Sequence, residues 1–187
     1  MNKQSDIIQP LSAELQRQVI DQTRVYIELA QDLLNIKQRP VEISFNLKGR
    51  CAGMYRVYRH VFSQRREIRY NAYIFSKYYD DNFETTIPHE VAHYVSDLIY
   101  GLKNIRPHGK EWKAIMQLFG ANDAVTADYD LSGIPLRKRT LYTYQCDCRE
   151  HQLSSVRHNR MNRSRSHYYC SYCKSALRPK DPLSKTA

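Results

Sequence analysis

The segment His89-Glu90-Val91-Ala92-His93 places two histidines four residues apart, with a glutamate directly after the first. If the segment is helical, the two imidazoles lie on one face, because side chains four apart in a helix share that face. Both can then bind one metal ion. Glu90 lies further round the helix, where its carboxylate can reach a water on the metal but is poorly placed to ligate it. The pattern therefore predicts a zinc hydrolase site with Glu90 as its catalytic residue.

A catalytic zinc ion takes three protein ligands and keeps one position open, so a third ligand must come from elsewhere in the chain. His108 is the preferred residue, because it follows a loop and precedes an apolar-periodic run that indicates a second helix. Glu111 is the alternative, although an acid in the first turn of a helix is also favoured by the helix dipole alone. The metzincin pattern is absent, since Ser96 and Ile99 occupy the positions where it has glycine and histidine.

The motifs IPHEVAH at residues 87–93 and HGKEW at residues 108–112 resemble those of the SprT family, the bacterial relatives of the Spartan metalloproteases. The resemblance runs from the strands near Val41 to the cysteines near the C-terminus. It implies that His89, His93 and His108 bind zinc and that Glu90 is catalytic. It also implies a cytoplasmic zinc protein with a C-terminal zinc ribbon. The eukaryotic branch of the family degrades proteins crosslinked to DNA.

Four of the five cysteines form two close pairs in the C-terminal quarter of the chain: Cys146 with Cys148, and Cys170 with Cys173. The chain has no apolar export signal at its N-terminus, and in a reducing compartment such pairs favour a metal over disulfides. The first pair is separated by one residue, so His151 remains open as a substitute for Cys146 or Cys148. We prefer the all-cysteine site, because thiolates are the softer match for a structural zinc ion.

The segment between the cysteine pairs is predicted to form a hairpin, with strands near residues 152–158 and 166–169 around a polar turn. Two cysteine pairs joined by a hairpin are typical of a zinc ribbon, in which the metal replaces a core that some fifty residues cannot build. A second, structural Zn²⁺ is therefore expected beside the catalytic one. The ribbon is assigned to residues 137–187 and the metalloprotease domain to residues 1–136.

The net charge of +10 is concentrated in the ribbon. Residues 137–187 contain 12 lysines and arginines against 3 acids, whereas residues 1–136 contain 17 against 16. Arginines that neutralise phosphates, interleaved with tyrosines that stack on bases, predict a surface for DNA without sequence specificity, single strands being favoured. A solubilising tail is the alternative. The predicted nucleic-acid contacts are Arg157, Arg160, Arg163 and Arg165.

The first domain is predicted to be a zincin-like α+β fold. A helix over residues 11–34, with Ser12 as its N-cap, precedes strands near residues 41–47, 52–59 and 67–71 that we expect to form a small antiparallel sheet. The metal-site helix is expected to stop at Gly101. It begins either near Asp81, with Pro88 in its interior, or near Thr86, with Pro88 in its first turn.

The predicted function is a zinc-dependent metallopeptidase that acts on protein substrates, with proteins bound or crosslinked to DNA as candidates. The alternatives are a non-catalytic, zinc-stabilised nucleic-acid-binding regulator and a zinc hydrolase of small molecules. No run of 18 apolar residues exists, so the sequence predicts a soluble, cytoplasmic protein without a membrane partner. Asp97, on the same flank of the helix as His93, could accept a hydrogen bond from a histidine, but an exposed acid is the simpler expectation.

Overall fold

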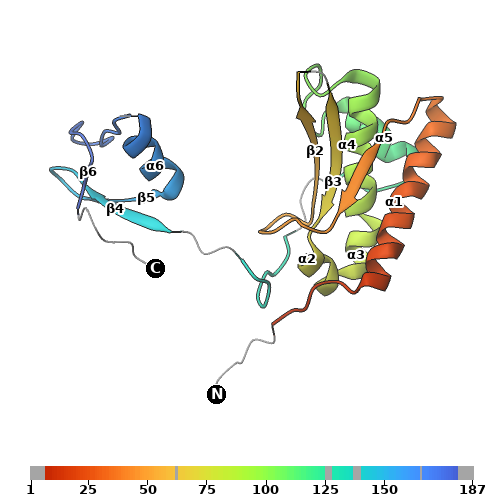
Figure 1. Ribbon diagram of the computed structural model, residues 1–187, viewed down its shortest axis with the longest axis horizontal. Coiled ribbons are helices and arrows are strands. Elements are labelled where there is room, and N and C mark those ends of the chain that lie inside the picture. Colours follow the sequence, from red (N-terminus) through yellow and green to blue (C-terminus); the bar gives the residue numbers. More distant parts are fainter. Residues whose placement is uncertain (1–6, 62, 125–127, 137–139, 165, 181–187) are drawn as a thin grey trace. The chain divides into compact units, whose positions relative to one another are not determined.

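The computed structural model describes residues 7–61, 63–124, 128–136, 140–164 and 166–180 (Figure 1). The chain divides into two compact units, Met1–Leu136 and Arg137–Ala187. Across the described residues, every helix is too short or too polar to span a bilayer.

The first unit begins with helix α1 (Ala13–Leu34). Ser12 caps it as predicted, since its hydroxyl oxygen accepts a hydrogen bond from the Leu15 N–H at 3.3 Å. The helix buries a stripe that includes Val19 and Ile27 against the rest of the core, and it ends at Asn35, whose backbone is left-handed.

Strands β1 (Val41–Ser44), β2 (Gly53–Arg59) and β3 (Gln64–Tyr70) form a sheet in the order β1-β3-β2. β2 is antiparallel to β3, but β1 is parallel to it, so the predicted antiparallel sheet is wrong for β1. The segment between β1 and β2 passes around the end of β3, where the Asn71 side chain donates to two of its carbonyl groups. Alternating side chains reveal which face of a strand is buried but not the order of the strands.

Helices α2 (Ala72–Lys77) and α3 (Tyr79–Glu84) lead into α4 (Thr86–Tyr100), and α5 (Lys110–Leu118) follows. α4 begins at Thr86, which decides between the two predicted starts and leaves Pro88 in the first turn, where it removes no helical hydrogen bond. It ends at Gly101, whose φ is 74°. α4 contacts α1, α5, β2 and β3, so it is the central helix of this unit (Figure 1).

The second unit contains β4 (Leu141–Gln145), β5 (Glu150–Ser154) and β6 (Arg178–Pro179), in the order β5-β4-β6. Helix α6 (Ser155–Ser164) occupies the segment where we predicted a strand and a turn, so that prediction is wrong. Its arginines and methionine are good helix formers, and it packs through Met161 and through His158, whose ring stacks on Tyr142 at 3.6 Å. The fold class is therefore mixed α+β with two small sheets.

Candidate metal centre

The structure brings three histidines together from two elements. His89 and His93 lie on successive turns of α4, and His108 immediately precedes α5. Their Nε2 atoms are 3.3 Å apart for His89 and His93 and 3.0 Å apart for each pair that includes His108. The backbone of His108 has a φ of 54°, the left-handed region that few residues other than glycine adopt. This turn of the chain directs the ring back toward α4.

The geometry of the three nitrogens fits a metal ion. Around a tetrahedral ion with metal–nitrogen bonds of about 2.1 Å, neighbouring nitrogens lie about 3.4 Å apart, close to the spacing seen here. Hydrogen bonds alone cannot hold the three nitrogens together. Each Nε2 of a neutral imidazole is either a donor or an acceptor, so at least two of the three have the same role and cannot bond to each other. A cation bound to all three lone pairs removes this conflict. Among the described residues, the group consists of these histidines without Glu111.

The histidines are held in the form that binds metal. Burial, reinforced by the neighbouring imidazoles, lowers the pKa of His89 to about 4 and that of His93 to about 3. Burial also lowers the pKa of His108. All three rings are consequently neutral at neutral pH, with lone pairs available for a metal ion.

Glu90 lies in the wall beside the histidines, with only 5% of its surface exposed. Burial raises the pKa of its carboxyl group to about 8, and the opposing effect of the Tyr55 backbone N–H is smaller. Glu90 therefore faces the backbone of β2 at the site, not bulk solvent.

Two hollows meet at this site and share Gly53, His89 and Glu90. The first has a volume of about 390 Å³ and a mainly apolar lining. The second has a volume of about 500 Å³ and includes charged and amide side chains. The three shared residues form a wall with one hollow on either side, and the two hollows together are called the groove below. The first hollow is also lined by Leu102, Ile105 and Pro107, and the second by Arg50, Asp81 and Tyr129.

Several neighbours of the site were not predicted as part of it. The ring of Trp112 packs against all three histidines, at centroid distances of 4.7 Å to His89, 5.6 Å to His93 and 4.7 Å to His108. The apolar spacing around Trp112 indicated a buried residue but not its partners. Gly53 and Tyr55 reach the site because β2 lies against α4, and a local motif carries no signal for such a long-range contact.

The expectation that Asp97 is an exposed acid is wrong. Its carboxylate is buried and pairs with the Arg66 guanidinium at 2.9 Å, and it accepts a hydrogen bond from the Tyr55 hydroxyl at 2.9 Å. Asp97 thus ties α4 to β2 and β3.

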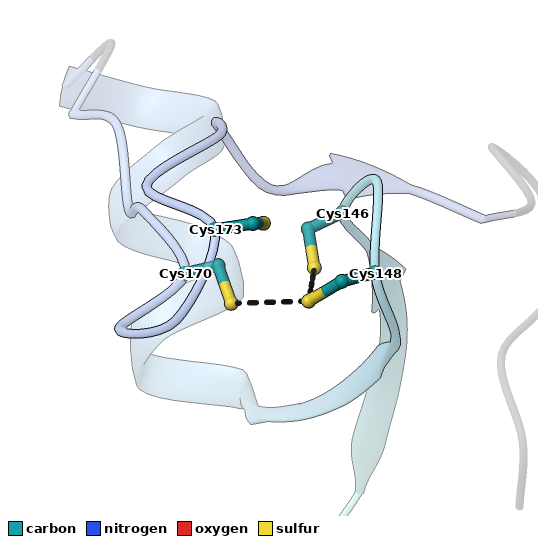
Figure 2. Close-up of side chains that lie close together, drawn as sticks. All are labelled: Cys146, Cys148, Cys170 and Cys173. Carbon is teal, nitrogen blue, oxygen red and sulfur yellow. Dashed lines mark hydrogen bonds between the residues drawn. The ribbon is translucent and has the colours of Figure 1, made fainter.

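A second group of ligand atoms lies in the C-terminal unit, where Cys146, Cys148, Cys170 and Cys173 converge (Figure 2). The Sγ atom of Cys148 is 3.5 Å from that of Cys146 and 3.7 Å from that of Cys170. These distances are far longer than a disulfide bond of about 2.05 Å. They match the spacing of about 3.8 Å expected for thiolates around a tetrahedral zinc ion with bonds of about 2.3 Å.

His151 lies beside the cysteine group without belonging to it. Its Nε2 atom is 3.2 Å from the Sγ of Cys146, within hydrogen-bonding distance of that sulfur. The donor set of this second site is therefore four sulfurs, with His151 as a neighbour of one of them.

Three of the four predicted nucleic-acid residues lie on α6. Arg157, Arg160 and Arg163 are exposed and recur every three residues, which places them on one side of the helix. The Arg157 guanidinium lies 5.9 Å from the centre of the Tyr168 ring, and that of Arg149 lies 3.7 Å from the centre of the Tyr172 ring. Arg165 lies outside the described residues.

Fold and site together define an α+β protein of the His-Glu-x-x-His class, with a third histidine completing a candidate metal group and a four-cysteine cluster beyond it. The profile of the SprT-like family matches residues 13–131, and the chain belongs to this family. The predicted resemblance is thus confirmed.

Relatives of similar length support the assignment. Protein SprT of Vibrio parahaemolyticus is 32% identical over 152 residues, which cover 81% of this chain and 86% of the relative. Protein SprT of Escherichia fergusonii is 31% identical over 160 residues, 84% of this chain and 90% of the relative. Protein SprT of Pasteurella multocida is 29% identical over 164 residues, 87% of this chain and 93% of the relative. No solved structure matches the chain.

Proposed function

We propose that this protein is a zinc-dependent metallopeptidase. The observation that carries the proposal is the place of Glu90, a buried carboxylate in the wall that both arms of the groove share with His89. A purely structural metal site has no use for a carboxylate between two of its ligands at the floor of an open groove. A hydrolase needs one there to take a proton from attacking water and pass it to the leaving amine.

His89, His93 and His108 would hold the zinc ion. When bound, zinc acts as a Lewis acid at the coordination position that three protein ligands leave open. The histidines contribute neutral rings, and Trp112 packs beside them. Glu90 would act as the base and then as the acid, its carboxyl group being ionised at neutral pH when the positive charge of the nearby zinc ion offsets the effect of burial.

We infer that the groove takes a polymer rather than a small molecule, because a hollow lies on either side of the wall that holds Glu90. β2 is an edge strand of its sheet, and Gly53, Met54 and Tyr55 of this strand line the groove. An extended peptide can add to such an edge through backbone hydrogen bonds, which is a common mode of peptide recognition. These features favour a protein substrate over the small-molecule alternative.

Glu90→Gln tests the catalytic role. We expect the zinc content and melting temperature to remain near those of the unmodified protein, while cleavage of casein or histones falls at least 100-fold. Glu84→Gln, which removes an exposed carboxylate from the preceding helix α3, is the matched control and should cleave normally. Equal cleavage by Glu90→Gln and the unmodified protein would contradict the proposal. DNA-dependent effects that survive Glu90→Gln intact would favour the regulator.

We further propose that the C-terminal unit brings the peptidase to proteins on DNA. The support is the exposed arginine row of α6 together with the pairs Arg157–Tyr168 and Arg149–Tyr172, which offer partners for phosphates and bases. Replacing Arg157, Arg160 and Arg163 by Gln should weaken binding to a single-stranded oligonucleotide and reduce its salt dependence. Each lost phosphate contact lowers the slope of the log of the binding constant against the log of the salt concentration by about 0.7.

The matched control removes the same charge from the first unit through Arg17→Gln, Arg24→Gln and Lys37→Gln, all at exposed positions. Fluorescence anisotropy across a salt series provides the measurement. An equal loss of binding in both triple variants would show a general charge effect and would refute a DNA surface on α6.

A further inference from the structure

Gly53, the first residue of β2, lies against the start of α4 at the point where Glu90 is buried. A Cβ atom added at Gly53 would lie 2.6 Å from both Cγ and Oε1 of Glu90 and 2.7 Å from Cγ2 of Thr86. Carbon atoms in contact normally lie about 3.5–4.0 Å apart. The space that any larger residue would fill is therefore already occupied, mainly by the Glu90 side chain.

The backbone on the β2 side of this contact is held in place. Gly53 pairs with Tyr70, which is fully buried in β3, and the preceding carbonyl group of Ala52 accepts a hydrogen bond from the Asn71 N–H at 2.8 Å. The Asn71 side chain donates to the Cys51 carbonyl at 3.3 Å. β2 consequently has little freedom to withdraw from α4.

The side chain of Thr86 is also fixed in its rotamer. Its hydroxyl donates to Oδ1 of Asn82 at 2.8 Å, which fixes the rotamer and directs the methyl group toward Gly53. Glu90 is the neighbour with a flexible side chain, and the groove that it lines offers space for that side chain. A Cβ atom at position 53 would thus move the carboxylate into the groove.

We propose that Gly53 is a positioning residue that seats the Glu90 carboxylate under the edge of β2. The missing side chain leaves a slot for Cγ and Oε1, so the carboxylate lies beside the histidine group and does not project across the path of the substrate. This inference rests on the proposed peptidase function for its catalytic consequence. The seating itself is a property of the fold.

Gly53→Ala tests the proposal. We expect a folded protein with normal zinc content, a kcat about 100-fold lower and a KM changed much less, because a displacement of about 1 Å at a catalytic group has an effect of this size. Arg56→Ala, at an exposed position of the same strand, is the control and should keep the kcat of the unmodified protein. A normal kcat in Gly53→Ala would overturn the proposal.

A second variant separates the two neighbours of Gly53. Thr86→Ser keeps the hydroxyl bond to Asn82 but removes the methyl group, so Gly53→Ala combined with Thr86→Ser relieves only the contact with Thr86. We expect the double variant to remain slow. Recovery of kcat would show that Thr86, and not Glu90, is the residue that Gly53 accommodates, and would refute the proposal.

A crystal structure of metal-free Gly53→Ala provides a readout independent of activity. We expect the Glu90 carboxylate to lie in the groove while the three histidines remain in place. An unmoved carboxylate would overturn the seating role. A displaced carboxylate in a protein that shows no peptidase activity even without the substitution would support the seating and refute the proposed function.

Discussion

The indole N–H of Trp112 donates a hydrogen bond to the backbone carbonyl of His89, with a distance of 3.2 Å between nitrogen and oxygen. The residue that packs against all three histidine rings therefore also anchors the helix that carries two of them. Groups behind the ligands commonly orient them and affect metal affinity.

Trp112 is the single tryptophan of the chain, so all tryptophan emission comes from a ring beside the histidine group. Adding Zn²⁺ to the metal-free protein should change the emission of Trp112, and Co²⁺ should quench it because the metal lies near the ring. Fluorescence titration of the unmodified protein and of His108→Ala measures this. A response of equal affinity in both proteins would show that His108 is not a ligand.

Trp112→Phe, followed by direct zinc titration, should lower metal affinity about 10-fold.

The buried pair of Arg66 and Asp97 predicts a large loss of stability when one partner is removed. Asp97→Ala leaves the Arg66 guanidinium buried without its carboxylate, and we expect a loss of about 3–5 kcal/mol in the free energy of unfolding. Urea denaturation followed by Trp112 emission measures it. Asp21→Ala, which breaks an exposed pair with Arg24, is the control and should cost less than about 1 kcal/mol. Similar losses in the two variants would contradict the prediction.

Glu67 predicts a dependence of stability on acid pH. Burial alone would raise the pKa of its carboxyl group, but hydrogen bonds from Ser44, Tyr58 and Asn46 outweigh this and hold the pKa below its usual value. The unfolded chain therefore binds a proton more readily than the folded one, and stability falls as the pH drops below the unfolded pKa of about 4.3.

Glu67→Gln should therefore destabilise the protein at pH 7 by about 1–3 kcal/mol and have a progressively smaller effect toward pH 3. Urea denaturation at a series of pH values measures the difference between variant and unmodified protein. Glu42→Gln removes an exposed carboxylate paired with Arg65 and should cause little change at any pH. An effect of Glu67→Gln that stays constant from pH 7 to pH 3 would refute the assignment.

The second unit should depend on its metal for folding. Among its described residues, the buried apolar cluster consists of Tyr144, Leu153, Cys170 and Leu177, too few to stabilise such a small unit alone. Cys148→Ala should lower the zinc content from two ions per chain to one and make the region beyond residue 137 sensitive to protease. His151→Ala should keep two ions, because His151 contacts a sulfur but is outside the group. The opposite pattern would identify His151 as a ligand.

Local sequence signals predicted much of the first unit correctly. The cap at Ser12 and the end of α4 at Gly101 both depend on residues within one helical turn, and both are present. The convergence of His108 with His89 and His93 was also expected, because a short loop joins their helices.

Features that depend on distant parts of the chain were not predictable in the same way. The parallel pairing of β1, the burial of Asp97 against Arg66 and the contact between Gly53 and Glu90 each join elements far apart in sequence. The helical conformation of α6 was missed because polar residues between cysteine pairs match both a turn and a short exposed helix. Tertiary contacts through Met161 and His158 decide between them.

The left-handed backbone at His108 turns the third ring toward α4, and the Gly109 N–H closes the turn by donating to the Arg106 carbonyl at 3.0 Å. The three-histidine group thus lies on a unit that is stabilised by its own apolar core. Zinc binding to the three histidines should leave the surrounding fold unchanged. Zinc binding to the four cysteines, in contrast, should be needed for the C-terminal unit to fold. Removing zinc should therefore leave the first unit folded while the C-terminal unit loses its structure.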